Sequence, residues 1–213
     1  MKTKTFAWIV FALLALSVGL YPLVYYIFDM HGKGLWASKT NELIASTAWH
    51  TAFYIHITFG GIALLTGWTQ FSQKLRDRYL NTHRTIGKIY VGSVMLSSLA
   101  GFYIALFASG GIASTLGFGG LAAAWFFTIV MAYTRILKRD IKQHENWMIR
   151  NYALTFAAVT LRIYLPLSQM THIEFIEAYR VISWLCWVPN LIVAEMIISK
   201  RARIPAYSVR ASE

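Results

Sequence analysis

The sequence predicts an all-α polytopic membrane protein with six transmembrane helices and a four-helix bundle core. Of the 213 residues, 57% are hydrophobic and only 14% are charged. The apolar residues come in runs of about 20, the length that crosses a bilayer as a helix. Lys and Arg gather on alternate connections between these runs, as expected when successive connections lie on opposite sides of a membrane.

Six apolar runs cover most of the chain. Their approximate ranges are 6–28, 49–71, 86–108, 118–137, 148–168 and 179–199. We expect the second to the fifth to form the bundle, and the first to remain as an uncleaved, lipid-facing anchor. No connection is long enough for a further domain, so residues 1–213 are expected to form one transmembrane domain.

Basic charge marks one side of the predicted membrane protein. The net charge is +11, and sixteen of the twenty Lys and Arg lie at the chain ends or near the connections that follow runs two and four. Positive connections stay in the cytoplasm, so we expect an inner-membrane protein with both termini cytoplasmic. The charge therefore reports topology and contact with the lipid bilayer, and we expect no nucleic-acid partner.

Two of the runs begin a stripe of small residues with a histidine. In run two, His56 is followed at helical spacing by Gly60, Ala63 and Gly67. Such a stripe is typical of close helix packing, and it also suits a slot for a flat ligand with the histidine at its mouth. At the start of run three, His83 leads a similar face that runs through Gly87, Tyr90, Ser97 and Gly101.

Polar residues line one narrow face of the fifth run. His144, Asn151, Thr155, Arg162 and Gln169 fall within about 40° of one another on a helix with 100° per residue. An arginine inside a membrane helix is costly, so it normally faces the bundle interior and has a partner.

Run six carries Glu195 at a depth similar to that of Arg150 on run five, and we expect these two residues to form a structural ion pair. Such a pair would fix the register of the two helices.

Depth divides the polar residues into two candidate sites. The inner site would contain His83 and His144 as metal ligands, with Arg84, Arg150 and Asn151 beside them. Imidazoles from two helices can bind a haem iron from opposite faces, and arginines can neutralise its propionates. The outer site would contain His56, Tyr103, Arg162 and Gln169 and would bind a ligand such as a quinone. We assign no catalytic residue.

Several motifs resemble a known family. They are His83 with Gly87 and Tyr90, the HxxWMxR segment that begins at His144, the LRxYLP segment around Arg162, and the segment from Trp184 to Glu195. Together they resemble a bacterial family of polytopic membrane proteins known as domain of unknown function 2306. That resemblance covers helices two to six and implies no function.

A more distant resemblance is to the ascorbate-dependent di-haem cytochrome b family of six-helix membrane proteins. It lies in the spacing from His83 to Gly87, Gly101 and Phe102. The resemblance implies one bis-histidine haem b, held by His83 and His144 on the cytoplasmic side. The family's second haem joins histidines of helices two and four, but run four contains no histidine to pair with His56.

The resulting hypothesis is a b-type-cytochrome-like protein that exchanges electrons with a quinone or a redox partner protein. Such a protein would be a membrane oxidoreductase or an electron-transfer protein. Two alternatives stay open. One is a non-redox binding or transport protein in which His56 and Arg162 hold a small anionic ligand. The other is an assembly partner of a respiratory complex.

Overall fold

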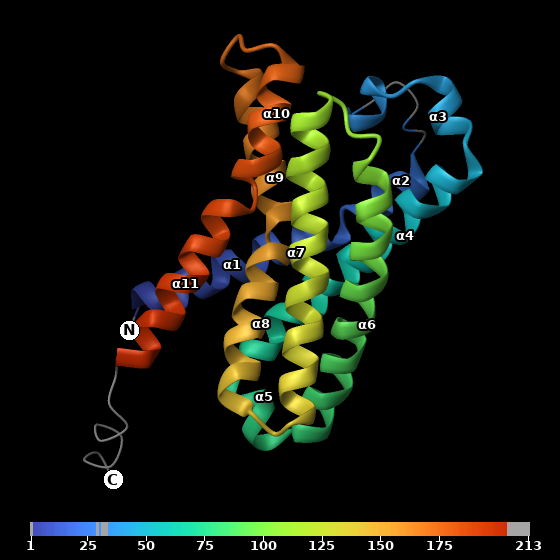
Figure 1. Cartoon of the computed structure of the whole chain (residues 1–213). Helices are drawn as coiled ribbons and strands as arrows, with labels where there is room; N and C mark the ends of the chain where they lie inside the picture. The colour runs from blue at the N-terminus through green and yellow to red at the C-terminus, as the bar shows by residue number, and fades with distance from the viewer. Residues whose placement is uncertain (1, 29, 31–33, 204–213) are drawn as a thin grey trace.

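The chain folds into helices that run side by side (Figure 1). The computed structural model describes residues 2–28, 30 and 34–203, and no strand forms within them. Five helical segments of this part are long and apolar enough to cross a membrane. They are Trp8–Ile27, Thr47–Phe71, Leu80–Ala105, Ile112–Leu137 and Phe175–Arg203. The predicted all-α class is confirmed.

Four helices form the expected bundle. They are α4 (Thr47–Gly67), α6 (Leu80–Ala105), α7 (Ile112–Leu137) and α8 (Ile141–Thr155). Each packs on the next in chain order, and α8 returns to contact α4, which closes the bundle. The apolar core between them includes Tyr90, Ile129 and Leu154, all of which are almost fully buried.

The fifth run departs from the expected single span over 148–168. It consists of α8 and α9 (Ala157–Gln169), which are separated at Phe156. This segment is not among the five that meet the length and hydropathy of a membrane span; both of its halves carry charged residues, Arg150 in α8 and Arg162 in α9 among them. The sixth run is also broken, into α10 (Phe175–Leu185) and α11 (Val188–Arg203), with Pro189 just after the break.

The first run crosses obliquely behind the bundle (Figure 1). It comprises α1 (Lys2–Leu20) and α2 (Pro22–Ile27), with a break at Tyr21. Gly19 and Gly61 let α1 and α4 approach closely, because a Cβ at Gly61 would lie 2.6 Å from the Gly19 carbonyl oxygen. This segment contacts α4 and α9 and so packs on the outside of the bundle.

The basic connections gather at one end of the bundle, here called the inner end. The 3₁₀ turn η2 (Trp68–Phe71) and the short helix α5 (Gln73–Arg78) cover this end. Arg76 on α5 pairs with Glu145 on α8 across 2.6 Å. At the opposite, outer end, the 3₁₀ turn η1 (Gly34–Ser38) and α3 (Asn41–Ala45) lie beside α2 and α4 (Figure 1).

Candidate functional site

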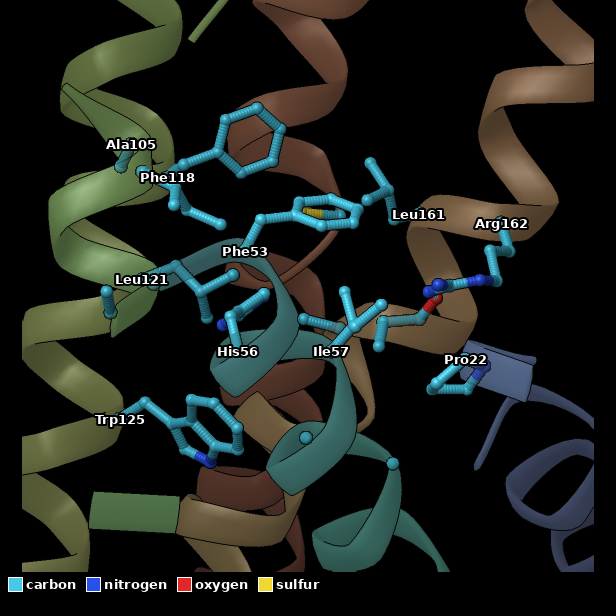
Figure 2. A pocket seen from close by; sticks show the side chains of 18 of the residues that line it. Pro22, Phe53, His56, Ile57, Ala105, Phe118, Leu121, Trp125, Leu161 and Arg162 are labelled. Atoms are coloured by element: carbon cyan, nitrogen blue, oxygen red, sulfur yellow. Dashed lines mark hydrogen bonds between the residues drawn. The ribbon is translucent and has the colours of Figure 1, made fainter. Parts of the chain in front are cut away.

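A cavity of about 210 Å³ lies toward the outer end, between α4, α6, α7, α9 and the α1–α2 junction (Figure 2). Most of its lining is apolar and aromatic. The basic or imidazole side chains in the lining are Lys39, His56 and Arg162, and no carboxylate belongs to the described lining. The cavity is therefore an apolar space with a few polar groups, which is the usual character of a small-molecule site.

His56 is held in one orientation by α6. Its Nδ1 lies 2.9 Å from the Ser97 carbonyl oxygen, and the Ser97 hydroxyl donates to the His56 carbonyl oxygen at 2.8 Å. A carbonyl oxygen only accepts hydrogen bonds, so Nδ1 carries the proton and Nε2 keeps its lone pair. Among the described residues, no group is hydrogen-bonded to Nε2.

Arg162 enters the cavity from α9. Its Nη1 donates to the Ala158 carbonyl oxygen at 3.1 Å, and its guanidinium carbon lies 4.6 Å from the centre of the Tyr21 ring. Its Nε is buried and has no hydrogen-bond partner within the described part of the chain. Leaving a buried donor unsatisfied costs about 1–3 kcal/mol, so this N–H needs an explanation.

Two residues expected at the outer site do not line the cavity. Tyr103 packs against Phe107 and the aromatic residues at the outer end. Tyr103 follows Gly101 by two residues, which is about 200° around α6. Its depth therefore matches that of the cavity, but it stands on another face of the helix. Gln169 is exposed and lies two turns beyond Arg162 at the end of α9. Both assignments are therefore corrected.

An aromatic cluster covers the cavity toward the outer end. Trp36, Trp49 and Phe53 pack against one another there, and Tyr25 of α2 joins them. All four line the cavity.

Beside this cluster, the outer clasp joins Ser38 and Lys39 to Phe107 and Ser109. Lys39 Nζ donates to the Phe107 carbonyl oxygen at 2.5 Å and to the Ser109 hydroxyl at 3.0 Å. Burial lowers the pKa of Lys39 to about 8. The clasp ties the loop before α3 to the loop between α6 and α7.

The two histidines of the expected inner site both lie at the inner end of the bundle. His83 is in the first turn of α6 and His144 in the first turn of α8, and neither lines the cavity. His144 Nδ1 donates to the Ala132 carbonyl oxygen at 2.9 Å, which leaves Nε2 with the lone pair. His83 Nδ1 is buried, and no described group is hydrogen-bonded to it.

Asn151 has a different role from the expected cofactor contact. Its amide nitrogen donates to the Trp125 carbonyl oxygen and to Thr128, and its oxygen accepts from the Tyr90 hydroxyl at 2.5 Å. Thr155 joins this group by bonding the Tyr90 hydroxyl at 2.9 Å. Because these bonds occupy both amide hydrogens, Asn151 has no donor left for a cofactor, and it serves as a buried structural link between α6, α7 and α8.

The two arginines expected at the inner site have different surroundings. Arg150 pairs with Glu195 on α11 through Nε at 2.5 Å and Nη2 at 2.9 Å, and it stacks on Trp147. The expected ion pair is thus present, and it leaves Arg150 unsuited to hold a propionate. Arg84 is exposed.

Sequence reasoning missed the way α6 shapes the outer cavity. Gly101 makes room for His56, and Ser97 fixes the imidazole. Both residues stood on the small-residue face that begins at His83. The signal was present, but nothing in the sequence showed that His56 of the neighbouring helix packs against that face.

Comparison with known proteins identifies the family. Residues 53–198 match the family model described as "Predicted membrane protein (DUF2306)", which covers more than half of the chain. The chain therefore belongs to this family, as its motifs indicated. No curated protein and no solved structure matches it. The resemblance to the di-haem cytochrome b family gains no support from these comparisons.

Proposed function

We propose that this member of the DUF2306 family binds a quinone-class ligand in its outer cavity and takes part in membrane electron transfer. One observation carries the proposal. The residues that line one apolar cavity include Arg162, whose buried Nε has no acceptor in the described structure, and His56, whose Nε2 has no donor there.

The chemistry of a quinone complements these two groups. Its carbonyl oxygens accept hydrogen bonds, so one can accept a hydrogen bond from Arg162 Nε. In the reduced quinol, a ring hydroxyl can donate a hydrogen bond to His56 Nε2, which could take this proton when a redox partner protein removes electrons from the quinol. The flat ring would pack between apolar walls that include Phe118 and Trp125. The volume of about 210 Å³ is below the roughly 300–1,000 Å³ of drug-sized sites and suits one small ring.

Tryptophan fluorescence provides the test, since Trp36, Trp49 and Trp125 line the cavity and quinones quench tryptophan. Protein in nanodiscs would be titrated with a short-chain ubiquinone. Arg162→Met should weaken ubiquinone binding about tenfold, as expected when a hydrogen bond worth about 1.4 kcal/mol is lost. His56→Gln should weaken binding of the reduced ubiquinol by a similar factor, because only the quinol has a hydroxyl that can donate to His56 Nε2.

Two matched variants control for general damage. Arg180→Met removes an outer-end arginine that bonds the Gly110 carbonyl oxygen, and His50→Gln changes another histidine of α4. Neither residue lines the cavity, so both variants should bind as the parent does. Equal affinity of all four variants, or no saturable quenching of the parent, would contradict the quinone proposal.

A haem b at the inner end is the second part of this proposal. Metal-ligating histidines usually donate their other ring N–H to a carbonyl or carboxylate, and His144 does so to Ala132. The buried Nδ1 of His83, which lacks a partner in the described structure, provides a further donor atom for the metal. Each of the two imidazoles therefore keeps a ring nitrogen that could bind a metal. His83 and His144 would hold it, Arg84 would remain for a propionate, and the haem would supply a one-electron carrier.

A reduced-minus-oxidised absorption spectrum tests the haem separately. Protein purified in mild detergent should show the α-band of a b-type haem after dithionite, and His83→Ala or His144→Ala should abolish it. His50→Ala should retain the band, because His50 packs against Trp36 and Tyr54 at the other end of the molecule. A colourless parent protein would eliminate the haem and leave the quinone test unaffected.

One observation favours a second candidate function, the binding or transport of a small anion. The described cavity lining contains Lys39 and Arg162 and no carboxylate. In that case benzoate would protect the protein against thermal unfolding, and this protection would be lost in Arg162→Met. Protection by benzoate together with no effect of ubiquinone would replace the first proposal with this one.

The orientation in the membrane is also proposed. Because the basic connections gather at the inner end, we place that end and both termini in the cytoplasm of a bacterial inner membrane. A cysteine placed at Lys138 in a Cys186→Ser background should react with a membrane-impermeant maleimide in inverted vesicles and remain protected in intact cells. The opposite pattern would reverse the orientation.

A further inference from the structure

The cavity is covered on the side that faces the outer aqueous phase. The aromatic residues Trp36, Trp49 and Phe53 lie over it, and each is less than a tenth exposed. The outer clasp, in which Lys39 bonds Phe107 and Ser109, ties the two outer loops together beside them. A water-soluble ligand would have to displace these aromatic residues and open the outer clasp to enter.

The side that faces the lipid has a thinner cover. The first run is broken at Tyr21, and Pro22 lines the cavity at the break. Tyr21 is 38% exposed although it lies within an apolar membrane span, so its ring meets lipid. The inner face of this ring covers the guanidinium of Arg162, itself part of the cavity lining (Figure 2 shows Arg162 beside Pro22). Tyr21 is therefore the aromatic side chain that packs on Arg162 at this side of the cavity, and Arg162 itself is only partly buried.

We propose that the contact between Tyr21, at the α1–α2 junction, and Arg162 of α9 is a lateral portal, and that the ligand is a lipid-soluble molecule whose apolar tail stays in the bilayer. The identity of the headgroup rests on the proposed function, but the route does not. When the Tyr21 ring swings aside, Arg162 becomes accessible from the lipid and can bind the polar head, and the head then passes to the cavity and His56.

The surface around the portal suits an apolar tail. Leu20 and Leu23 flank Tyr21 and are 51% and 52% exposed, and Ile163 follows Arg162 and is 42% exposed. These side chains would contact a tail that extends from the portal along α2 and α9. A cavity of about 210 Å³ has room for a polar head but not for a long tail as well, so a tailed ligand would leave its tail outside.

Cys186 allows the route to be measured without any ligand. It is the one cysteine of the chain, it is fully buried, and it lines the cavity. Protein in nanodiscs would be treated with a maleimide that carries a dodecyl chain and, separately, with a sulfonated maleimide. Modification would be followed by intact mass.

The dodecyl reagent should label the parent several-fold faster than the sulfonated one, and Tyr21→Ala should raise its rate at least fivefold. Two variants control for loosening. Tyr26→Ala removes another exposed tyrosine of α2 that does not line the cavity, and Ser109→Ala weakens the outer clasp. Both should label at the parent rate. Faster labelling by the sulfonated reagent, acceleration by Ser109→Ala, or no dodecyl labelling of Tyr21→Ala would overturn the portal.

A second arm separates the portal from the headgroup. Ubiquinone with two isoprene units should protect Cys186 from the dodecyl reagent, and the tail-less ring should protect much less at the same concentration. Equal protection by the tailed ubiquinone and by the tail-less compound would overturn the requirement for a tail. If neither ring protects while Tyr21→Ala still accelerates labelling, the quinone proposal fails and the portal stands.

Discussion

The imidazole of His56 occupies the space that a side chain at Gly101 would fill. A Cβ at position 101 would lie 2.7 Å from His56 Nδ1 and 2.9 Å from Cε1. The ring is fixed there by Ser97, one turn earlier on α6. Glycine at position 101 is therefore a requirement of the histidine on the neighbouring helix, and the orientation of His56 depends on both helices.

This relationship predicts that Gly101→Ala moves His56 and weakens ligand binding. The imidazole must leave the Ser97 carbonyl oxygen, and overpacking should lower the free energy of unfolding by about 1–3 kcal/mol. Gly92→Ala is the matched control on α6, because its Cβ would meet no atom within 4 Å. That variant should be neutral or stabilised by up to about 1 kcal/mol. Unfolding by denaturant and quinone titration would be measured for both, and equal behaviour would contradict the prediction.

Hydrophobic runs, charge asymmetry and helical spacing were enough to predict the helical class, the bundle and the ion pair of Arg150 with Glu195. They were not enough for the sites, because a helical face shows which residues point together but not what they meet. Asn151 and Thr155 stand on the same stripe as His144, yet they bond Tyr90 inside the core. The break at Phe156 was missed for a similar reason, since no Pro or Gly marks it; the Ala153 carbonyl oxygen just before it accepts a hydrogen bond from Asn190 of α11.

The buried network around Tyr90 predicts a large effect of a small change. Tyr90→Phe removes the hydroxyl that donates to Asn151 and bonds Thr155, so two buried polar groups lose a partner. The free energy of unfolding should fall by about 1–3 kcal/mol. Tyr133→Phe changes an exposed tyrosine of α7 and should alter stability by less than about 0.5 kcal/mol. A Tyr90→Phe protein as stable as its parent would show that the network contributes little.

The lowered pKa of Lys39 predicts that the stability of the protein depends on pH. Its pKa is about 8 in the folded protein and near the ordinary 10.5 when unfolded. Between these values the unfolded chain binds more protons, so stability should rise with pH from about 8 to 10.5 and stay level below 8. Lys39→Met should remove this rise, and Lys88→Met, at an exposed position, should retain it. Thermal unfolding across this pH range would be compared as differences from the parent, and an identical slope in Lys39→Met would refute the assignment.

Replacement by methionine should have different effects on stability at Arg150 and at Arg162. Arg150→Met breaks a two-bond pair and leaves the Glu195 carboxylate unpartnered, so the protein should lose about 0.5–1 kcal/mol. Arg162→Met removes a buried N–H that has no acceptor in the described structure, and its other contacts are one local hydrogen bond and the Tyr21 ring. Replacing such a group by an apolar one is often neutral or stabilising. We therefore expect Arg162→Met without ligand to be at least as stable as the parent in denaturant unfolding, while its stabilisation by ubiquinone disappears. A loss of several kcal/mol without ligand would instead mean that Arg162 serves the fold and not a ligand.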